Sequence, residues 1–176
     1  MSRRIVIAYW LIPTEPARSF FEGVINDLAR RYRAPRFEPH VTIHVGANRA
    51  NAAEIALSEV ARDCKRVRLD AIGLGSSAKF IKTLFVEFAA NKKLHLINQI
   101  IRTAAEDSLH YRLKPHLSLL YKRMREAARR ELADSINLSF SGVTFDTLKA
   151  VRCISPTQNR ADVEAWRVIG TQKLFR

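Results

Sequence analysis

Two segments of the chain repeat one pattern around a histidine. Residues 37–43 read apolar, charged, Pro, His, apolar, hydroxyl, apolar, and residues 113–119 follow the same order position by position. In a β-strand, residues two apart point to the same face. One face of each strand is therefore expected to carry two residues of its motif: His40 and Thr42 from the first, His116 and Ser118 from the second.

These four side chains are suited to displacement at phosphorus. If both strands face one cleft, two imidazoles and two hydroxyls converge on a single volume. A neutral histidine can take a proton from an attacking water, and a protonated one can give a proton to the leaving oxygen. Hydroxyls can donate to non-bridging phosphate oxygens. We therefore expect His40 and His116 to be the catalytic acid and base, in either assignment, and Thr42 and Ser118 to bind phosphate.

This apparatus requires neither a metal nor a cofactor. A cyclic phosphodiester suits it, because attack opens a ring and the leaving oxygen stays tethered. A metal site built from His40, His44 and His116 is rejected, since no carboxylate joins these histidines at a useful spacing. His44 continues the alternation of the first motif, so we expect it deeper on the cleft face, with no assigned role.

The two motifs lie a little under half the chain apart, and similar elements are expected around each. This indicates a duplication. We predict an α+β fold of two βαβ-type lobes related by a pseudo-twofold axis, with antiparallel sheets lining a central cleft. Residues 1–176 are interpreted as a single domain, in which each lobe carries one motif.

Hydrophobic periodicity and the turn residues that bound each segment predict the elements that position the motifs. A capping box at Ser19–Glu22 predicts the start of one helix, and Asn51-x-x-Glu54 is expected to open a second. Residues 73–77 are expected to form a hairpin-like break between two strands. The other expected elements are strands at 5–11, 41–45, 67–72, 80–88, 117–121 and 166–174, two strands within 138–154 around Ser141-Gly142, and helices over 94–104 and 124–132.

Composition limits the class of partner. Lys and Arg number 30 against 17 Asp and Glu, a formal net charge of +13, which favours an anionic partner such as nucleic acid, a nucleotide or a membrane surface. The apolar run 5–12 is shorter than the roughly 20 residues of a membrane span, so it predicts a buried strand. We expect a soluble cytoplasmic protein, with Cys64 and Cys153 reduced and no Cys-based zinc site.

Other residues leave alternatives open. Tyr121 either lines the cleft near the base or phosphate or is a core aromatic, and Trp10 either stacks on a base or belongs to the core. Lys79 and Lys82 are expected to be solvated rather than to touch phosphate. Arginine runs at 30–36 and 123–130 flank the two motifs and favour an electrostatic funnel toward them.

The chain resembles the two-histidine (2H) phosphoesterase superfamily, and within it the cyclic phosphodiesterase branch. The resemblance is carried by residues 9–13, 35–42 and 114–121. It implies a bilobal α+β fold, catalytic His40 and His116, and phosphate-binding Thr42 and Ser118. It also implies metal-independent hydrolysis of nucleoside 2′,3′-cyclic phosphates or ADP-ribose 1″,2″-cyclic phosphate, and a cleft position for Tyr121.

Two other functions remain in competition. One is an RNA 2′–5′ ligase or phosphodiesterase that acts on RNA ends, because the net charge of +13 exceeds what a small nucleotide requires. The other is a non-catalytic RNA-binding module, although a pure binder needs neither histidine. The expected partner is a cyclic phosphate on a nucleotide or RNA end, with RNA on the basic surface, no membrane, and a monomeric protein.

Overall fold

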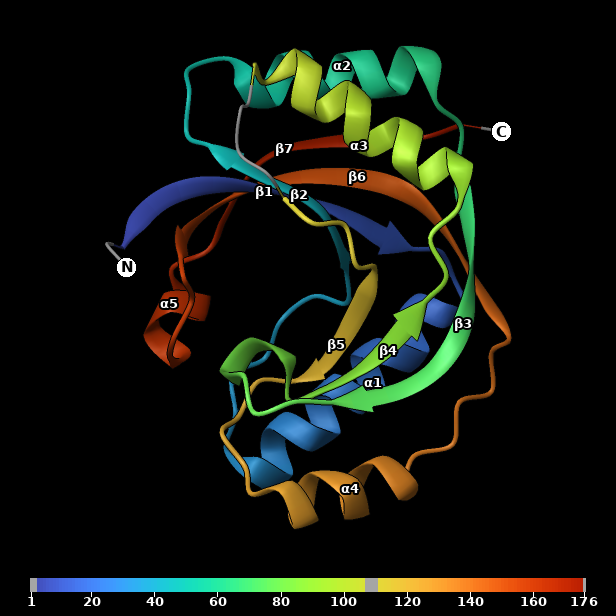
Figure 1. Ribbon diagram of the computed structural model, residues 1–176, viewed down its shortest axis with the longest axis vertical. Coiled ribbons are helices and arrows are strands. Elements are labelled where there is room, and N and C mark those ends of the chain that lie inside the picture. Colours follow the sequence, from blue (N-terminus) through green and yellow to red (C-terminus); the bar gives the residue numbers. More distant parts are fainter. Residues whose placement is uncertain (1–2, 107–110, 176) are drawn as a thin grey trace.

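A computed structural model describes residues 3–106 and 111–175 (Figure 1). Strands and helices alternate through most of the chain. The elements are β1 (Arg4–Pro13), α1 (Ala17–Tyr32), β2 (Val41–Ala47), α2 (Ala52–Asp63), β3 (Val67–Ser76), the 3₁₀ turn η1 (Phe80–Lys82), β4 (Leu84–Phe88), α3 (Lys92–Ala104), β5 (His116–Leu120), α4 (Glu126–Asp134), β6 (Gly142–Ser155), α5 (Arg160–Glu164) and β7 (Arg167–Lys173).

The order strand, helix, strand, helix, strand occurs twice, first from β1 to β3 and then from β4 to β6. The strand pairings repeat with it, because β1 pairs β2 as β4 pairs β5, and β3 pairs β4 as β6 pairs β1. Every pairing among the described strands is antiparallel. The predicted α+β fold with antiparallel sheets is therefore confirmed, and the assignment of residues 1–176 to one domain stays a prediction.

The strands form one continuous hydrogen-bonded sheet in the order β1-β2-β5-β4-β3-β6-β7, and the pairing of β1 with β6 closes the first six into a ring. The long strand β6 pairs β3 at its start and β1 along the rest of its length. Figure 1 shows two layers of helices outside this ring, with α2 and α3 beside β6 and β7 and α1 and α4 beside β3, β4 and β5.

The helices are exchanged between the two halves of the repeat. Helix α1 follows β1 but packs on β5, and α3 follows β4 but packs on β2. The strands that each of these helices joins are antiparallel neighbours, whereas a βαβ unit joins parallel strands. The predicted βαβ-type lobes therefore need correction, because each lobe is built from segments of both sequence halves.

Strand β1 confirms the expectation of a buried first strand. It lies between β2 and β6, and its residues from Val6 to Ile12 are at most 5% exposed. Ile7, Tyr9 and Leu11 point into the main core, whereas the alternate residues Ala8, Trp10 and Ile12 form a small cluster on the other face. Neither face of the strand is left to solvent, which is why the run is continuously apolar. No helix in the described part of the chain is long and apolar enough to cross a membrane.

Three local predictions were wrong. The predicted break at 73–77 is mostly strand, because β3 continues to Ser76 and the connection to β4 follows it. Gly75 permits this, since a Cβ there would lie 2.5 Å from the Phe85 ring. Residues 80–82 form the turn η1 instead of strand. Residues 142–155 form one long strand rather than two, because β6 passes from β3 to β1 without turning back.

The capping box predicted at Ser19 is also wrong. Helix α1 begins at Ala17, so Ser19 lies inside its first turn. The acceptor is the carboxylate of Glu15, which receives hydrogen bonds from both the backbone N–H and the hydroxyl of Ser19. These bonds lower the pKa of Glu15. The cap is therefore supplied from the turn before the helix, where an anion also meets the positive helix end.

We predict that Gly75→Ala destabilises the fold by about 1–3 kcal/mol, because the new methyl group meets the Phe85 ring, which the His116 ring and Lys82 also contact. Gly23→Ala is the matched control: it lies within α1, has open space for a Cβ, and should stabilise by about 0.5–1 kcal/mol. Urea unfolding measures both. Equal effects at the two glycines would contradict this packing, and Phe85→Leu should recover part of the loss.

Candidate active site

All four motif residues line one cavity of about 320 Å³. His40 and Ser118 are buried, whereas Thr42 and His116 are half-buried. Lysines and an arginine share the walls with them. The remaining lining residues are Val45, Lys79, Ile81, Lys82, Tyr111, Arg112, Lys114 and Tyr121. The structure thus brings together the two imidazoles and two hydroxyls that the sequence pattern placed on two separate strands.

The contact between β2 and β5 explains this convergence. The two strands are joined at Val41 and Leu117, both fully buried. The residues on either side of each point to the opposite face. Because the strands are antiparallel, this register sets His40 opposite Ser118 and Thr42 opposite His116. Each histidine therefore has as its neighbour the hydroxyl of the other motif.

The two rings are oriented by the same device. Nδ1 of His40 lies 2.6 Å from the carbonyl oxygen of Glu38, and Nδ1 of His116 lies 2.8 Å from that of Lys114. A carbonyl oxygen only accepts, so Nδ1 carries the proton in both rings. A neutral ring then presents an unprotonated Nε2. Each histidine is held in the tautomer that can accept a proton from water.

Burial lowers the pKa of both histidines. The pKa of His40 falls from 6.5 to about 4, chiefly by desolvation and further by the charge of His116, against the opposing hydrogen bond to Glu38. The pKa of His116 is lowered by desolvation and by Lys82, against the hydrogen bond to Lys114 and the charge of Glu87. Both rings are therefore neutral at pH 7 when no anion is bound.

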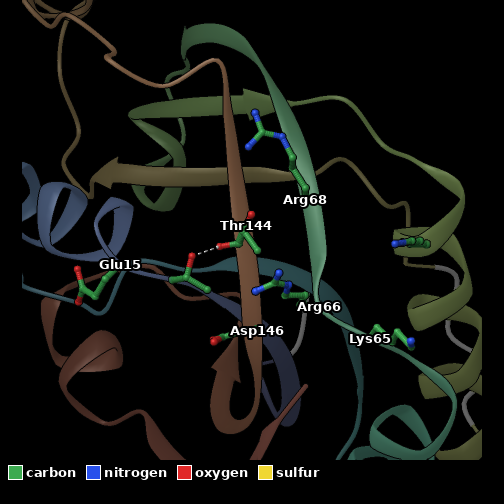
Figure 2. A pocket seen from close by; sticks show the side chains of 8 residues that line it. Glu15, Lys65, Arg66, Arg68, Thr144 and Asp146 are labelled. Atoms are coloured by element: carbon green, nitrogen blue, oxygen red, sulfur yellow. Dashed lines mark hydrogen bonds between the residues drawn. The ribbon is translucent and has the colours of Figure 1, made fainter. Parts of the chain in front are cut away.

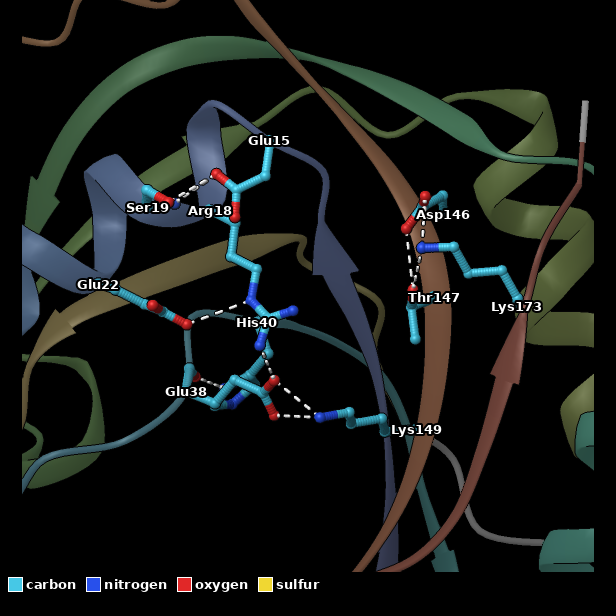
Figure 3. Close-up of polar contacts among 10 residues, drawn as sticks. All are labelled: Glu15, Arg18, Ser19, Glu22, Glu38, His40, Asp146, Thr147, Lys149 and Lys173. Atoms are coloured by element: carbon cyan, nitrogen blue, oxygen red, sulfur yellow. Dashed lines mark hydrogen bonds and ion pairs between the residues drawn. The ribbon is translucent and has the colours of Figure 1, made fainter.

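The carbonyl that orients His40 belongs to a residue fixed by ion pairs (Figure 3). Lys149 Nζ donates to both carboxylate oxygens of Glu38 at 2.7 Å, and Arg18 donates to one of them at 3.2 Å. Lys149 and Glu38 are only 19% and 20% exposed. Helix α1 and strand β6 thereby hold the segment that leads into β2. In the second motif the corresponding residue, Lys114, is exposed.

The two hydroxyls differ in their surroundings. The Ser118 hydroxyl donates to the carbonyl oxygen of Ile81 in η1 at 2.9 Å. Among the described residues, no hydrogen bond of this kind holds the Thr42 hydroxyl. The backbone carbonyl of Thr42 accepts from the Tyr111 hydroxyl at 3.3 Å. Ser118 therefore has to exchange the Ile81 carbonyl for a phosphate oxygen when it donates to a ligand.

A second, more apolar cavity of about 200 Å³ adjoins the first and shares His40, Thr42 and Tyr121 with it. Trp10 lines it but is 5% exposed and stacks on the His40 ring at a centroid distance of 3.8 Å. Trp166 meets Trp10 edge-on at 5.1 Å. Trp10 therefore belongs to the core and also forms a cavity wall, and its stacking on a base stays a prediction.

Tyr121 also combines its two alternatives. Its ring stacks on Phe37 at 3.7 Å and is 3% exposed, yet it borders both cavities. Burial raises the pKa of its hydroxyl, which stays protonated and able to donate.

Trp166 and Tyr111 were not singled out from the sequence. Trp166 could have been noticed as a second tryptophan, next to Arg167 at the start of a strand. Tyr111 gave no such signal, because it belongs to an irregular segment without periodicity.

Strand β2 does not keep the expected alternation. A β-bulge shifts the pairing with β1, so that Trp10 faces Thr42 and Tyr9 faces His44. His44 consequently lies in the core, 0% exposed, near the Tyr9 and Tyr111 rings. Val45 takes the cleft position in its place. The expectation that His44 lies on the cleft face was wrong, because the bulge reverses the strand's faces.

The cations of the cleft are not those expected. Lys79 and Lys82, expected to be solvated, line the cavity together with Arg112 and Lys114. The arginine runs that flank the motifs do not line it, and several of their members make ion pairs on their own helices: Arg30 and Arg31 with Asp27, and Arg130 with Glu126. Within the described ranges, no three His, Cys, Asp or Glu side chains are grouped as metal ligands.

Comparisons with known proteins show the family of this chain. The model of the family "Cyclic phosphodiesterase-like protein" matches residues 5–174. A cyclic phosphodiesterase from Arabidopsis thaliana is 22% identical over 176 residues, covering 98% of this chain and 97% of that protein. A 2′,3′-cyclic-nucleotide 3′-phosphodiesterase from Eremothecium gossypii is 24% identical over 210 residues, covering 98% and 93%.

The fold has solved counterparts. The crystal structure of LigT from E. coli in complex with 3′-AMP aligns with a TM-score of 0.59 at 12% identity, covering 97% of this chain and 98% of that one. At this identity the likeness shows the fold alone. The family model spans nearly the whole chain, which confirms the resemblance inferred from the two motifs. The chain belongs to the cyclic phosphodiesterase-like family.

Proposed function

We propose that the protein hydrolyses a cyclic phosphodiester on a nucleoside or RNA end without a metal, using His40 and His116 as acid and base. The observation that carries the proposal is the shared cavity of four motif side chains, in which each imidazole is anchored through Nδ1. The names of the Arabidopsis and Eremothecium relatives support a 2′,3′-cyclic nucleotide as substrate. ADP-ribose 1″,2″-cyclic phosphate has the same reacting group.

The reaction needs one neutral and one protonated imidazole. A water attacks phosphorus and loses a proton to the neutral Nε2, while the bond from phosphorus to the ring oxygen breaks and that oxygen takes a proton from the protonated Nε2. The products are a phosphomonoester and a free hydroxyl, and the two imidazoles exchange their protonation states. Since both histidines line one cavity, the orientation of the cyclic phosphate decides which histidine takes each role.

The two adjoining cavities suit the two ends of such a substrate. The larger one combines the motif hydroxyls with four cations, which favours the phosphate. The smaller one is bordered by Trp10, Tyr121 and Trp166, which favours a nucleobase. Trp10 also fixes the His40 ring by stacking. We therefore assign Trp10 and Tyr121 to substrate binding, alongside Thr42 and Ser118.

An RNA 2′–5′ phosphodiesterase is the second candidate. Lys79, Lys82, Arg112 and Lys114 supply four positive charges at the cleft, more than a single cyclic phosphate neutralises. Further phosphates of an RNA end would complement them. Turnover of 2′,3′-cyclic nucleotides, ADP-ribose cyclic phosphate and cyclic-ended or 2′–5′ linked RNA, each in EDTA, tests the proposal and separates the candidates. Turnover of none of them would leave a binding module.

We predict that His40→Ala and His116→Ala each lower kcat by about 10²–10⁴, the usual contribution of one general acid or base. The exposed His95 of α3 provides the control, and His95→Ala should retain full turnover. Activity should also survive EDTA. Near-normal turnover in either cleft variant, or loss in EDTA that zinc restores, would refute the mechanism.

We predict that kcat/KM is highest below pH 6.5. In the free protein the pKa of His40 is about 4 and that of His116 is lowered from 6.5, so the state with one proton on the pair declines as pH rises through the upper pKa. Below the lower pKa both rings are protonated and kcat/KM falls again. A bound phosphate raises both pKa values, so the profile of kcat should lie at higher pH.

Lys82 provides the test of this electrostatic cause. Its charge lowers the pKa of His116, so Lys82→Met should move the basic limb of kcat/KM to higher pH. Lys79 lines the same cavity but is not among the charges that lower this pKa, so Lys79→Met should change KM without moving the limb. A basic limb above pH 7 in the unmodified protein would contradict the assignment.

We predict that Ser118→Ala and Thr42→Ala each lower kcat/KM by about 10–100-fold, because one hydrogen bond to a charged group contributes about 1.5–3 kcal/mol. Thr42→Ser keeps the donor and should stay within a few-fold of the parent. Mass spectrometry of a quenched reaction should show no phosphorylated protein. A phosphate attached to Ser118 or Thr42 would instead establish a covalent intermediate.

A further inference from the structure

A second basic cavity, of about 640 Å³, shares no lining residue with the catalytic cleft (Figure 2). Four of its residues are cations, two are carboxylates and two are threonines: Lys65, Arg66, Arg68, Lys93, Glu15, Asp146, Thr14 and Thr144. In Figure 1 the turn between β3 and β4 and the end of β6, which border the catalytic cleft, lie on the left, whereas β3 and α3 begin on the right. The two cavities are therefore lined by segments from different parts of the ring.

The carboxylates of this cavity are already engaged. Glu15 accepts from the first turn of α1 through Ser19. Asp146 pairs with Lys173 at 2.8 Å. Among the residues that the structure describes, Lys65, Arg66 and Lys93 make no ion pair, and the only one of Arg68 is a 3.9 Å contact with the exposed Asp70. Of the four cations around this hollow, only Arg68 has an anionic partner in the described part of the chain, and that contact is long.

The start of α3 adds to the same potential. Its first turn contains Lys92 and Lys93 and no acidic residue, although the positive end of a helix favours anions. Asn91 ties this helix end to β3, because its side chain accepts from Leu94 N–H and donates to the Arg68 carbonyl at 2.8 Å. The arrangement of like charges is unfavourable in the protein alone, and a bound anion would relieve it.

The lining also indicates what kind of anion fits. The described residues that line the cavity include no aromatic side chain, so a base finds no aromatic ring on which to stack there. Its volume of about 640 Å³ exceeds that of the catalytic phosphate site. Guanidinium groups bind phosphate oxygens in bidentate fashion. The chemistry is that of several phosphates in sequence, bound without regard to base identity.

We propose that this cavity binds the phosphodiester backbone of an RNA strand. The choice of RNA rests on the proposed function, because a 2′,3′-cyclic phosphate is an end that only a ribonucleotide can carry. The cavity then supplies sequence-independent affinity for longer substrates, separate from the cleft that holds the reacting end. It also gives the excess of positive charge a defined place at which to act.

Binding of a 12-nucleotide RNA with a 3′-hydroxyl end, followed by fluorescence anisotropy from 50 to 200 mM salt, tests this without catalysis. The variant Arg66→Ala/Arg68→Ala/Lys93→Ala should bind at least tenfold more weakly at 50 mM salt. The slope of log K against log salt should become less negative by about 0.7 for each phosphate that the variant no longer neutralises. The control is Arg30→Ala/Arg62→Ala/Arg130→Ala, which removes the same charge from arginines paired outside the cavity and should stay within about threefold of the parent.

Turnover of a small 2′,3′-cyclic nucleotide should be unchanged in both triple variants, since none of their residues lines the cleft. Equal RNA affinity and salt slope in the cavity variant and the control would overturn the proposal. So would tight binding of tripolyphosphate that RNA does not displace, which would indicate a free polyphosphate instead. If the parent turns over no cyclic phosphate but the cavity variant alone loses RNA binding, the proposed function fails and this site stands.

Discussion

A single cross-strand contact determines the site. The pairing of β2 with β5 rests on Val41 and Leu117, and each of these core residues directly follows a motif histidine in the sequence. A displacement of one strand by one residue would turn its motif away from the cleft, so that the two motifs would no longer share a face. The closed ring prevents this, because β1 and β4 hold the outer sides of the two strands. The exchanged helices α1 and α3 cover the same pair from outside.

The repeat is symmetric in its backbone and asymmetric in its chemistry. The carbonyl that orients His40 belongs to Glu38, clamped by Lys149 and Arg18, whereas the carbonyl that orients His116 belongs to the exposed Lys114. An acid–base pair requires two groups that are not equivalent at the same pH. Duplication supplies the matching geometry, and divergence of the residues before each histidine separates the two environments. Burial then lowers the pKa of His40 to about 4, and the shift of His116 includes the charge of Lys82.

The features predictable from the sequence were those that depend on local periodicity. The duplicated motif follows from matching residue types, the buried first strand from a continuous apolar run, and the shared face of His40 and Thr42 from their spacing of two. The Ser19 cap failed for a local reason, since Glu15 four residues earlier takes the place of the predicted cap, but other failures involve a partner distant in sequence. The bulge that turns His44 inward is visible only in the pairing with β1, and the extension of β3 through Gly75 depends on the approach of Phe85. Periodicity likewise could not predict that α1 packs on β5 and α3 on β2, because it shows which face of a helix is apolar but not which strand that face packs on.

The cations of the cleft have two opposing effects on the proposed chemistry. Lys82 attracts a phosphate, yet in the free protein it lowers the pKa of His116 and so disfavours the protonated ring that the reaction needs. A bound phosphate carries the opposite charge and offsets this effect, so the imidazole gains its proton together with the substrate. The free protein therefore keeps both rings neutral, and the anion that is to be cleaved creates the acid. Cations placed a few residues away on the flanking helices, such as Arg30 and Arg130, are held by carboxylates of their own helices and have no part in this coupling.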